Sequence, residues 1–279
     1  MFHNINIFDA QHIIEYRKGV VRLNNSNICV LGKDNRMDYI AQGLYDLGYD
    51  VYRDEVNINK DSVIILPPPV GDSELKQIFP RLFERNIVYG GAVSNRFRHE
   101  CELNNINVYD YLKWNEVTER NAEITARGAI KEAYTIRQLK NSSNCLVTGY
   151  GFCGKAISKE LKGLTKNISI MVRRKELKQE IEKMGYKYSS IKDIYLDARN
   201  YDYIFNTIPA LVLDEDVINT LTPKTIIIDI ASAPGGTDFE CCRRRDITAR
   251  LSLGIPGKMY PKEAGKIILD AVLNHMNSI

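Results

Sequence analysis

The sequence lacks the signals that direct a protein into a membrane or out of the cell. No stretch approaches the roughly 18 consecutive apolar residues of a membrane span. The start, MFHNINIFDAQH, is polar where a signal peptide has an apolar core. The six cysteines show no CxxC spacing, which is typical of reduced thiols rather than of a disulfide framework or a zinc site. These absences predict a cytoplasmic protein without a membrane segment or a metal site.

Excess charge and repeated sequence are lacking as well. The net charge is only +3, and basic residues do not interleave with aromatic ones as in single-strand-binding platforms, so no nucleic-acid partner is expected. No solenoid-type repeat or low-complexity segment is found. What is present is an ordinary globular composition, 44% hydrophobic and 26% charged, over 279 residues. That length corresponds to about two domains.

Short apolar runs alternate with helical patterns along the whole chain. Strands are predicted at 27–32, 49–53, 62–69, 86–92 and 106–111, and a second series at 145–149, 168–172, 186–190, 201–209 and 225–232. Such alternation indicates parallel sheets with crossover helices. We therefore predict an α/β fold: two doubly wound, Rossmann-like parallel-sheet domains joined by a long helix. Ligands are expected at the carboxyl ends of the strands, in a cleft between the domains.

A helical pattern from about Trp114 to Leu139 separates the two series, and the polar run NSSN at 141–144 follows it. The predicted organisation is an N-terminal α/β domain for substrate or partner at 1–118 and a linking helix at 119–140. An NADP(H)-binding Rossmann domain follows at 141–255. Residues 256–279 end in a helix that is expected to pack back on the N-terminal domain. The Gly/Pro-rich stretch GIPGKMYPKEAG at 254–265 is predicted to be a loop before the last helix, for which PKEAGKIILDAVLNHM has an amphipathic pattern.

A glycine turn opens the second series. In CLVTGYGFCG, residues 149, 151 and 154 fit the pattern G-x-G-x-x-G between an apolar strand and a helix. The first glycine allows the tight turn, the second lets a pyrophosphate approach the backbone, and the third lets the helix pack closely. The phosphates would meet the free N–H groups of the helix start. The predicted cofactor-binding residues here are Gly149, Tyr150, Gly151, Phe152, Cys153 and Gly154.

The next strand ends in two arginines rather than in an acidic residue. In NAD-binding units an acid about twenty residues after the glycines binds the ribose 2′-hydroxyl. Arg173 and Arg174 stand at that position, and guanidinium groups bind phosphate through paired donors. The sequence therefore favours NADP(H), with NAD(H) as the other possibility. The competing interpretation is a solvated basic start of the next helix, continued by Lys175 and Lys178.

Two loops that leave later strands complete the predicted cofactor site. FNTIPA supplies Asn206, Thr207, Ile208 and Pro209, and DIASAPGGTDF supplies Ala231 and Ser232. Both loops follow carboxyl ends of strands, where a nicotinamide ring would lie. The competing interpretation is an ordinary loop rich in turn residues. No catalytic residue can be assigned, because His3, His12, His99 and His275 have no carboxylate partner at a strand end and are predicted to lie at the surface.

The stretches NTIPALVLDEDVINTLTPKTIIIDIASAPGGTDF and GIPGKMYPKEAGKII resemble the A-subunit family of dipicolinate synthase from spore-forming bacteria. The N-terminal half is similar more loosely, through VLGKDNR, VSN and NAEITARGAI. The resemblance implies a fold akin to the dehydrogenases of alanine and 2-hydroxy acids. It also implies an oxidoreductase that works with the flavoprotein-like B subunit of dipicolinate synthase in the mother cell during sporulation. Its substrate would be a small dicarboxylate, a dihydrodipicolinate-type precursor of dipicolinate.

The two carboxylates of such a substrate require donors, and an oligomeric enzyme is expected. Candidate substrate-binding residues follow strands or lie on the linking helix or a late loop: Arg36, Ser94, Asn95, Thr125 and Lys258. Lys33 and Arg127 depart from the family pattern, which commonly has glycine and an acidic residue there. Two alternatives stay open. One is an NADP(H)-binding regulatory subunit without turnover, and the other is a dehydrogenase of the alanine or 2-hydroxy-acid type acting on monocarboxylates.

Overall fold

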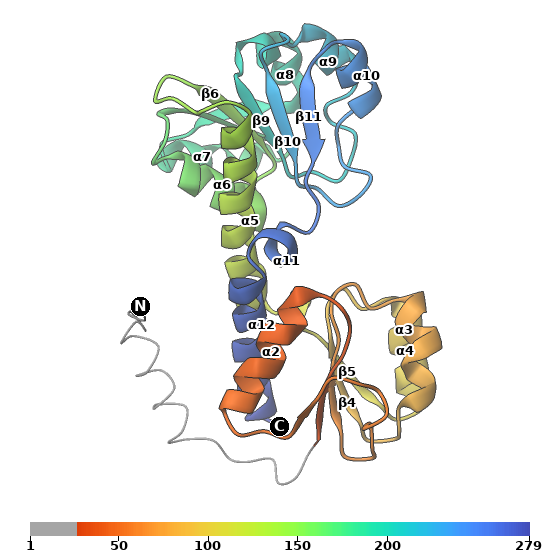
Figure 1. Ribbon diagram of the computed structural model, residues 1–279. Helices are drawn as coiled ribbons and strands as arrows, with labels where there is room; N and C mark the ends of the chain where they lie inside the picture. Colours follow the sequence, from red (N-terminus) through yellow and green to blue (C-terminus); the bar gives the residue numbers. More distant parts are fainter. Residues whose placement is uncertain (1–26) are drawn as a thin grey trace. The chain divides into compact units, whose positions relative to one another are not determined.

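The computed structural model describes residues 27–279. The start of the predicted N-terminal domain, with the polar stretch MFHNINIFDAQH, His3 and His12, lies outside the described residues. The chain divides into two compact units. Unit 1 comprises the described residues up to Thr118 together with Tyr260–Ile279, and unit 2 is Glu119–Met259 (Figure 1).

Unit 1 contains a five-stranded sheet in which every pairing is parallel. Its order is β2-β1-β3-β4-β5, the flavodoxin-like arrangement in which the direction of winding reverses between β1 and β3. The strands are β1 (Ile28–Val30), β2 (Val51–Tyr52), β3 (Val63–Ile65), β4 (Ile87–Gly90) and β5 (Asn107–Asp110).

Helices cover both faces of this sheet (Figure 1). On one face lie α3 (Asp72–Gln77), η1 (Phe79–Arg81) and α4 (Asn95–Leu103), packed on a core that includes Cys29, Ile64 and Val88. On the other face α2 (Asn35–Asp46) and α12 (Pro261–Met276) lie side by side. Glycine allows that close approach, because a Cβ on Gly43 would lie 2.4 Å from the Leu269 side chain.

Unit 2 contains a six-stranded parallel sheet of order β11-β10-β9-β6-β7-β8. Read from β8, this is the Rossmann order 3-2-1-4-5-6, with its switch point between β6 and β9. The strands are β6 (Asn144–Thr148), β7 (Asn167–Val172), β8 (Lys187–Ser190), β9 (Tyr203–Asn206), β10 (Ile226–Asp229) and β11 (Thr248–Leu251). The predicted fold class, two parallel-sheet α/β domains, is confirmed.

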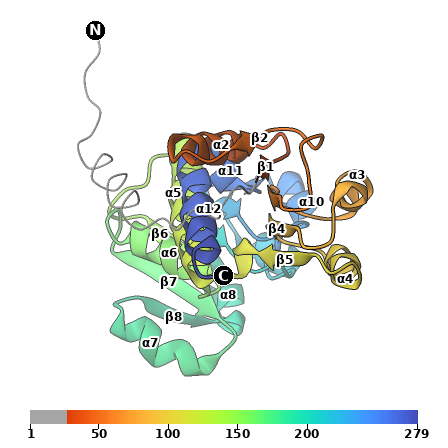
Figure 2. The same cartoon turned by 90° about the horizontal axis from the view of Figure 1, so that it is seen from below.

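The core of unit 2 follows the alternation of its strands. Leu146, Ile204 and Ile227 face a cluster that includes Val217 of α9 (Glu215–Thr220) and Cys241 of α10 (Phe239–Arg244). The helices between β6 and β9 are, in chain order, α6 (Phe152–Leu161), η3 (Lys175–Leu177), α7 (Lys178–Lys183), α8 (Ile191–Asp197) and η4 (Ala198–Asn200). Figure 2 shows β6, β7 and β8 in succession, with α7 beside β8.

The predicted loop at 254–265 is wrong. It contains α11 (Ile255–Met259) and the first turn of α12. Pro256 and Pro261 stand in the first turns of these helices. Proline is tolerated there because the first N–H groups of a helix have no intrahelical partner.

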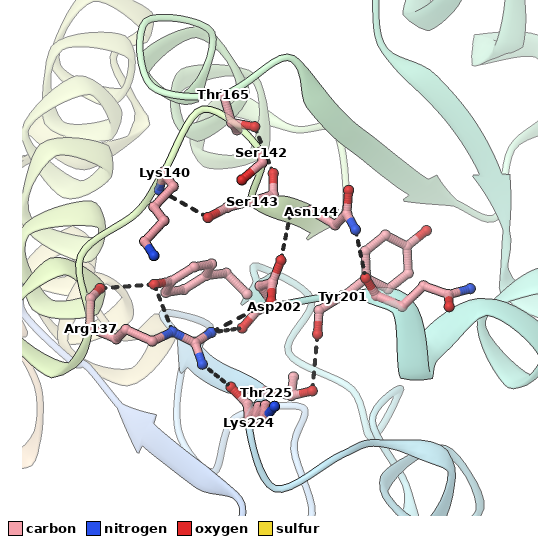
Figure 3. A network of polar contacts seen from close by, with 12 residues as sticks. Arg137, Lys140, Ser142, Ser143, Asn144, Thr165, Tyr201, Asp202, Lys224 and Thr225 are labelled. Carbon is pink, nitrogen blue, oxygen red and sulfur yellow. Dashed lines mark hydrogen bonds and ion pairs between the residues drawn. The ribbon is translucent and has the colours of Figure 1, made fainter.

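The long helix α5 (Asn115–Ile136) is anchored to unit 2 by the residue that follows it. The Arg137 guanidinium donates to the Tyr203 hydroxyl at 3.2 Å and to the carbonyl oxygens of Lys224 at 2.7 Å and Asp202 at 3.1 Å (Figure 3). The Tyr203 hydroxyl donates back to the Arg137 carbonyl at 2.9 Å. These groups lie at the amino ends of β9 and β10, so the carboxyl edge of the sheet stays clear of this network.

His275, expected at the surface, is instead half-buried in an aromatic cluster of unit 1. Its Nδ1 lies 2.9 Å from the Tyr89 hydroxyl oxygen, and its ring stacks on Trp114 with centroids 5.2 Å apart. The ring centroid of Tyr109 is 4.3 Å away. Burial lowers the pKa of His275, so the folded protein favours the neutral ring. The imidazole thereby attaches the last turn of α12 to β4 and β5.

We expect unit 1 to lose stability as the pH falls below the ordinary histidine pKa of about 6.5. A depressed folded-state pKa gives stabilisation that is complete above the unfolded value and lost on protonation. Urea unfolding followed by fluorescence of Trp114, the single tryptophan of the chain, measures this directly between pH 8 and 5.5. His275→Gln keeps a hydrogen-bonding group for Tyr89 but cannot titrate, and it should flatten the pH dependence. Parallel curves for the two proteins would contradict the expectation.

Candidate cofactor and substrate site

The glycine turn joins β6 to α6 beside the switch point of unit 2. Gly149 has a φ of +89°, a conformation that favours glycine, and a Cβ there would lie 2.5 Å from the Thr207 hydroxyl oxygen. A Cβ on Gly154 would lie 2.2 Å from the Gly149 carbonyl oxygen. The third glycine therefore lets α6 start directly against the turn. Packing within the protein accounts for both of these glycines.

Gly151 has no such packing reason. Its φ is −81°, which any residue adopts, and apart from its two chain neighbours no residue lies within 4 Å of where its Cβ would be. It is the N-cap of the ten-residue helix α6 and offers no side-chain acceptor to the first turn. Free N–H groups and the positive end of the helix dipole attract anions. The turn thus combines open space with anion-binding backbone, which fits a dinucleotide pyrophosphate.

The remaining side chains of the turn differ in exposure. Phe152 is 46% exposed, whereas Tyr150 is buried beneath the ammonium group of Lys155, 5.0 Å from the ring centroid. Cys153 is half-buried, and burial raises the pKa of its thiol. The thiol is therefore neutral at pH 7 and does not add negative charge to the turn.

Arg173 and Arg174 directly follow β7, the strand that pairs with β6. The Gly149 N–H donates to the Met171 carbonyl at 2.8 Å, which fixes the glycine turn against the end of this strand. Both arginine side chains are exposed, and within residues 27–279 neither has an acidic partner. Lys178, by contrast, lies 3.9 Å from Glu182. The two guanidinium groups are therefore available to an external anion such as a phosphate.

The loop after β9 is fastened to the glycine-turn strand by its own polar side chains. Asn206 is fully buried, accepts from the Thr148 hydroxyl and from the Ile208 N–H at 3.1 Å, and donates to the Ile208 carbonyl at 3.1 Å. The Thr207 hydroxyl donates to the Thr148 carbonyl at 2.7 Å. The side chains of Asn206 and Thr207 therefore stabilise the loop, since their hydrogen bonds are made within the protein. Ile208 is half-buried and Pro209 exposed, so they form the accessible part of the loop.

Asp229 was not among the predicted site residues, although it ends an apolar strand and precedes a glycine pair. It is fully buried, and its carboxylate accepts from the N–H groups of Ala231 at 3.0 Å and Gly236 at 2.8 Å. The Thr237 hydroxyl donates to it at 2.7 Å. Asp229 therefore shapes the loop that carries Ala231, which is buried, and Ser232, which is exposed.

Unit 1 has a comparable turn after β1. Gly32 has a φ of +91°, and a Cβ there would lie 2.6 Å from Pro67 Cγ. Arg36, in the first turn of α2, donates to the Asp34 carboxylate through Nε at 2.8 Å and Nη2 at 2.6 Å. The hydrogen bond from Arg36 is the main cause that lowers the pKa of Asp34. The Arg36 side chain is 11% exposed, and these bonds leave its Nη1 for a further acceptor.

The loop after β4 carries two more predicted residues. Ser94 caps α4, accepting from the Phe97 N–H at 3.2 Å, and Asn95 is exposed at the first position of that helix. Asp110, which sequence reasoning missed, accepts from the N–H groups of Ala92 and Val93, each at 3.0 Å. The structure therefore places Arg36, Ser94 and Asn95 at the starts of α2 and α4, helices that follow strands of the same sheet.

The other predicted substrate-binding residues belong to unit 2. Thr125 lies on α5, where its hydroxyl donates to the Asn121 carbonyl at 2.7 Å, and Lys258 is exposed on α11. The residues that depart from the family pattern, Lys33 and Arg127, are exposed and half-buried, respectively. Among residues 27–279 no cluster of His, Cys, Asp and Glu side chains could hold a metal ion. In the same part of the chain, every helix is too short or too polar to cross a membrane.

No protein-family model matches the sequence. The chain is 27% identical over 293 aligned residues to the A subunit of dipicolinate synthase from Bacillus subtilis (strain 168), covering 90% of this chain and 95% of that protein.

Solved structures share the architecture. The crystal structure of the dipicolinate synthase A subunit from Bacillus halodurans superposes with a TM-score of 0.81 at 24% identity, covering 91% of this chain and 98% of that one. The apo-structure of D-lactate dehydrogenase from Escherichia coli superposes with a TM-score of 0.64 at 12% identity, covering 90% and 96%. At these identities the superpositions show the fold alone. The sequence match and the shared fold confirm that this chain resembles the A subunit of dipicolinate synthase over nine-tenths of its length.

Proposed function

We propose that this protein is the nicotinamide-binding subunit of a dipicolinate synthase. It would bind NADP(H) in unit 2 and, with the flavoprotein-like B subunit, oxidise a dihydrodipicolinate-type precursor to dipicolinate in the mother-cell cytoplasm during sporulation. The main support for cofactor binding is Gly151. No contact within the protein requires a glycine at this position. The substrate and the partner follow from the similarity to the Bacillus subtilis protein.

The reaction removes two hydrogens from a cyclic dicarboxylate and leaves an aromatic ring. A bound NADP⁺ would supply the hydride acceptor. The glycine turn and the helix start would hold its pyrophosphate, and Arg173 and Arg174 would hold its 2′-phosphate. Neither described histidine lies at a strand end of unit 2, so the accompanying proton is expected to pass to water. Aromatisation makes this oxidation strongly favourable, so a strong base is not required.

The substrate carboxylates need donors, and Arg36 is the strongest candidate. Its ion pair with Asp34 fixes the guanidinium at the turn after β1 while one terminal nitrogen stays available. Ser94, Asn95, Thr125 and Lys258 remain the other candidates. An oligomeric assembly is part of the proposal, because the relative is one subunit of a synthase.

A regulatory subunit that binds NADP(H) without turnover is the second candidate function. It is favoured by the lack of a histidine–carboxylate pair within residues 27–279. The same observation counts against a 2-hydroxy-acid dehydrogenase, which would need such an acid–base group beside the nicotinamide. Turnover of the cyclic precursor separates the synthase from the regulatory subunit.

Gly151→Val should abolish NADPH binding and leave stability nearly unchanged. The new side chain would enter open space next to a backbone of ordinary φ, so it strains nothing in the protein. A bound pyrophosphate would collide with it. Isothermal calorimetry and thermal unfolding measure the two effects. Gly154→Ala is the control for packing, because its Cβ would meet the Gly149 carbonyl oxygen at 2.2 Å and should lower the melting temperature. Unimpaired NADPH binding by the Gly151→Val variant would show that the pyrophosphate does not bind at this turn.

The unmodified protein should bind NADPH about tenfold to a hundredfold more tightly than NADH. Hydrogen bonds between charged groups contribute about 1.5–3 kcal/mol, which corresponds to that range. Replacing both Arg173 and Arg174 with Ala should remove the preference and leave NADH binding nearly unchanged. The matched control replaces Arg243 and Arg244, an exposed adjacent pair on α10. Equal affinity of the unmodified protein for the two cofactors would contradict the NADP(H) assignment.

The purified chain should form little or no dipicolinate from the cyclic precursor and NADP⁺. Adding the flavoprotein-like partner should start dipicolinate formation, followed by its near-ultraviolet absorbance, and the two proteins should co-elute on size exclusion. The reason is that the similar Bacillus subtilis protein is one subunit of a synthase, and a site shared by two subunits is incomplete in either of them alone. Full turnover by the chain alone would show that the partner is dispensable. NADPH binding without turnover in the presence of the partner would favour the regulatory subunit.

A further inference from the structure

A cavity lies at the amino edge of the unit 2 sheet, where β6, β7 and β8 begin and η4 leads into β9. Its volume is about 500 Å³, within the range of cavities that hold small ligands. The glycine turn lies at the other end of β6, roughly 15 Å away at about 3.3 Å per residue. The cavity is therefore separate from the proposed cofactor site.

Hydrogen bonds within the protein fix one wall of the cavity. Asn144 Nδ2 donates to the Asn200 carbonyl at 3.0 Å, and the Asn144 N–H donates to the Asp202 carboxylate at 2.9 Å (Figure 3). The Tyr201 carbonyl accepts from the Thr225 hydroxyl at 3.0 Å. Because these groups bind one another, a ligand would enter a site that is already formed.

Ser169 contributes a buried hydroxyl for which the protein supplies no partner. It lies in β7, opposite Leu146 of β6 and Lys187 of β8, lines the cavity, and is 5% exposed. Within residues 27–279 its side chain makes no hydrogen bond. A buried polar group without a partner costs free energy, and native proteins pair nearly all of them. The hydroxyl therefore indicates a polar group that enters the cavity.

The charges around the cavity are positive. Lys166 is exposed, lines the cavity, and has no acidic partner in the described part of the chain. The Lys162 Nζ lies 5.0 Å from the ring centroid of Tyr186, a lining residue, and it too lacks an acidic partner there. None of the residues that line this cavity, all of them described, is Asp or Glu. The cavity therefore attracts an anion.

Two tyrosine rings add apolar surface. Tyr186 and Tyr201 both line the cavity, and each is only 6% exposed. Tyrosine offers a flat apolar ring against which another ring packs favourably. Together with the hydroxyl and the ammonium groups, these rings suit a ligand that has both a carboxylate and a ring.

We propose that this cavity is a second ligand site of unit 2 and takes a small cyclic or aromatic carboxylate. Ser169 donates to the carboxylate, and Lys162 and Lys166 balance its charge. Dipicolinate is the probe, because it is the product in the proposed function; the choice of probe rests on that function, whereas the site does not. A ligand held here occupies the protein together with the cofactor, since the two sites lie at opposite ends of β6.

Calorimetric titration of the Arg36→Ala variant with dipicolinate tests the site, because that substitution weakens the proposed substrate site alone. One equivalent should bind, with the same affinity in the presence and absence of saturating NADPH. In this background Ser169→Ala should weaken binding about threefold to tenfold, the loss expected for one hydrogen bond. Lys166→Gln should weaken it about twofold to fivefold, as for one exposed charge. Ser169→Ala should not lower the melting temperature, because it removes a hydroxyl that the protein does not use.

Matched controls are Ser189→Ala and Lys131→Gln. Ser189 is a buried serine of β8 that does not line the cavity, and Lys131 is exposed on α5. Both variants should bind dipicolinate as before. Glutarate, which has two carboxylates and no ring, and inorganic phosphate should each bind about threefold to tenfold more weakly than dipicolinate, because they cannot pack on the tyrosine rings.

The outcomes separate this inference from the proposed function. Loss of dipicolinate binding in Arg36→Ala, or binding that neither Ser169→Ala nor Lys166→Gln weakens, would overturn the second site and leave the proposed function intact. Phosphate binding as tight as that of dipicolinate would show attraction of any anion and overturn the ligand class. Failure to bind NADPH, with dipicolinate binding that depends on Ser169 and Lys166, would overturn the proposed function and support the second site.

Discussion

The close approach of α6 to the end of β6 is the contact on which the carboxyl edge of unit 2 depends. It exists only because Gly154 carries no Cβ that would meet the Gly149 carbonyl oxygen. Gly149 in turn leaves room for the side chain of Thr207. Ile208, the residue after Thr207, has its carbonyl oxygen 2.3 Å from the position that a Cβ of Gly236 would take. Asp229 completes the series by binding the Gly236 N–H. Glycine contacts and one buried carboxylate thus connect the ends of β6, β9 and β10.

The glycine turn could be predicted from sequence because its pattern is local: the three glycines fall within six residues, between an apolar run and a helical one. The hydrogen bonds that Asp229 and Asp110 accept could not be predicted from the sequence. Their partners are backbone N–H groups, which nearly every residue has, so no sequence pattern marks them. The His275 cluster escaped prediction for another reason. Tyr89, the hydrogen-bond partner of His275, is 186 positions away in the sequence. Only the packing of α12 on the sheet of unit 1 brings the two side chains together.

The prediction of secondary structure failed for elements whose side chains are largely exposed. The predicted strands of both units are mostly buried apolar runs, and the structure has strands there. β11, which was not predicted, reads TARL and forms an exposed edge of the sheet, so it has neither the apolar run nor the alternation that indicates a strand. The short helix α11 around Pro256 was missed because proline and glycine are typical loop signals, although proline is common in the first turn of a helix.

The two units share one construction and differ at the start of the helix that follows the first strand. Each has a glycine of positive φ after its first strand, Gly32 and Gly149, packed on the loop across its switch point. In unit 1 the helix that follows begins with Asp34, whose carboxylate accepts from the Arg36 N–H at 2.9 Å and fills the helix start with negative charge. In unit 2 the corresponding cap is Gly151, which brings neither a side chain nor a charge. The carboxylate of Asp34 thus partly satisfies the N–H groups at the start of α2, whereas those at the start of α6 are open to an external anion such as a phosphate. The proposed nucleotide site therefore lies in unit 2, and at the corresponding turn of unit 1 stands an arginine that is fixed by its ion pair with Asp34.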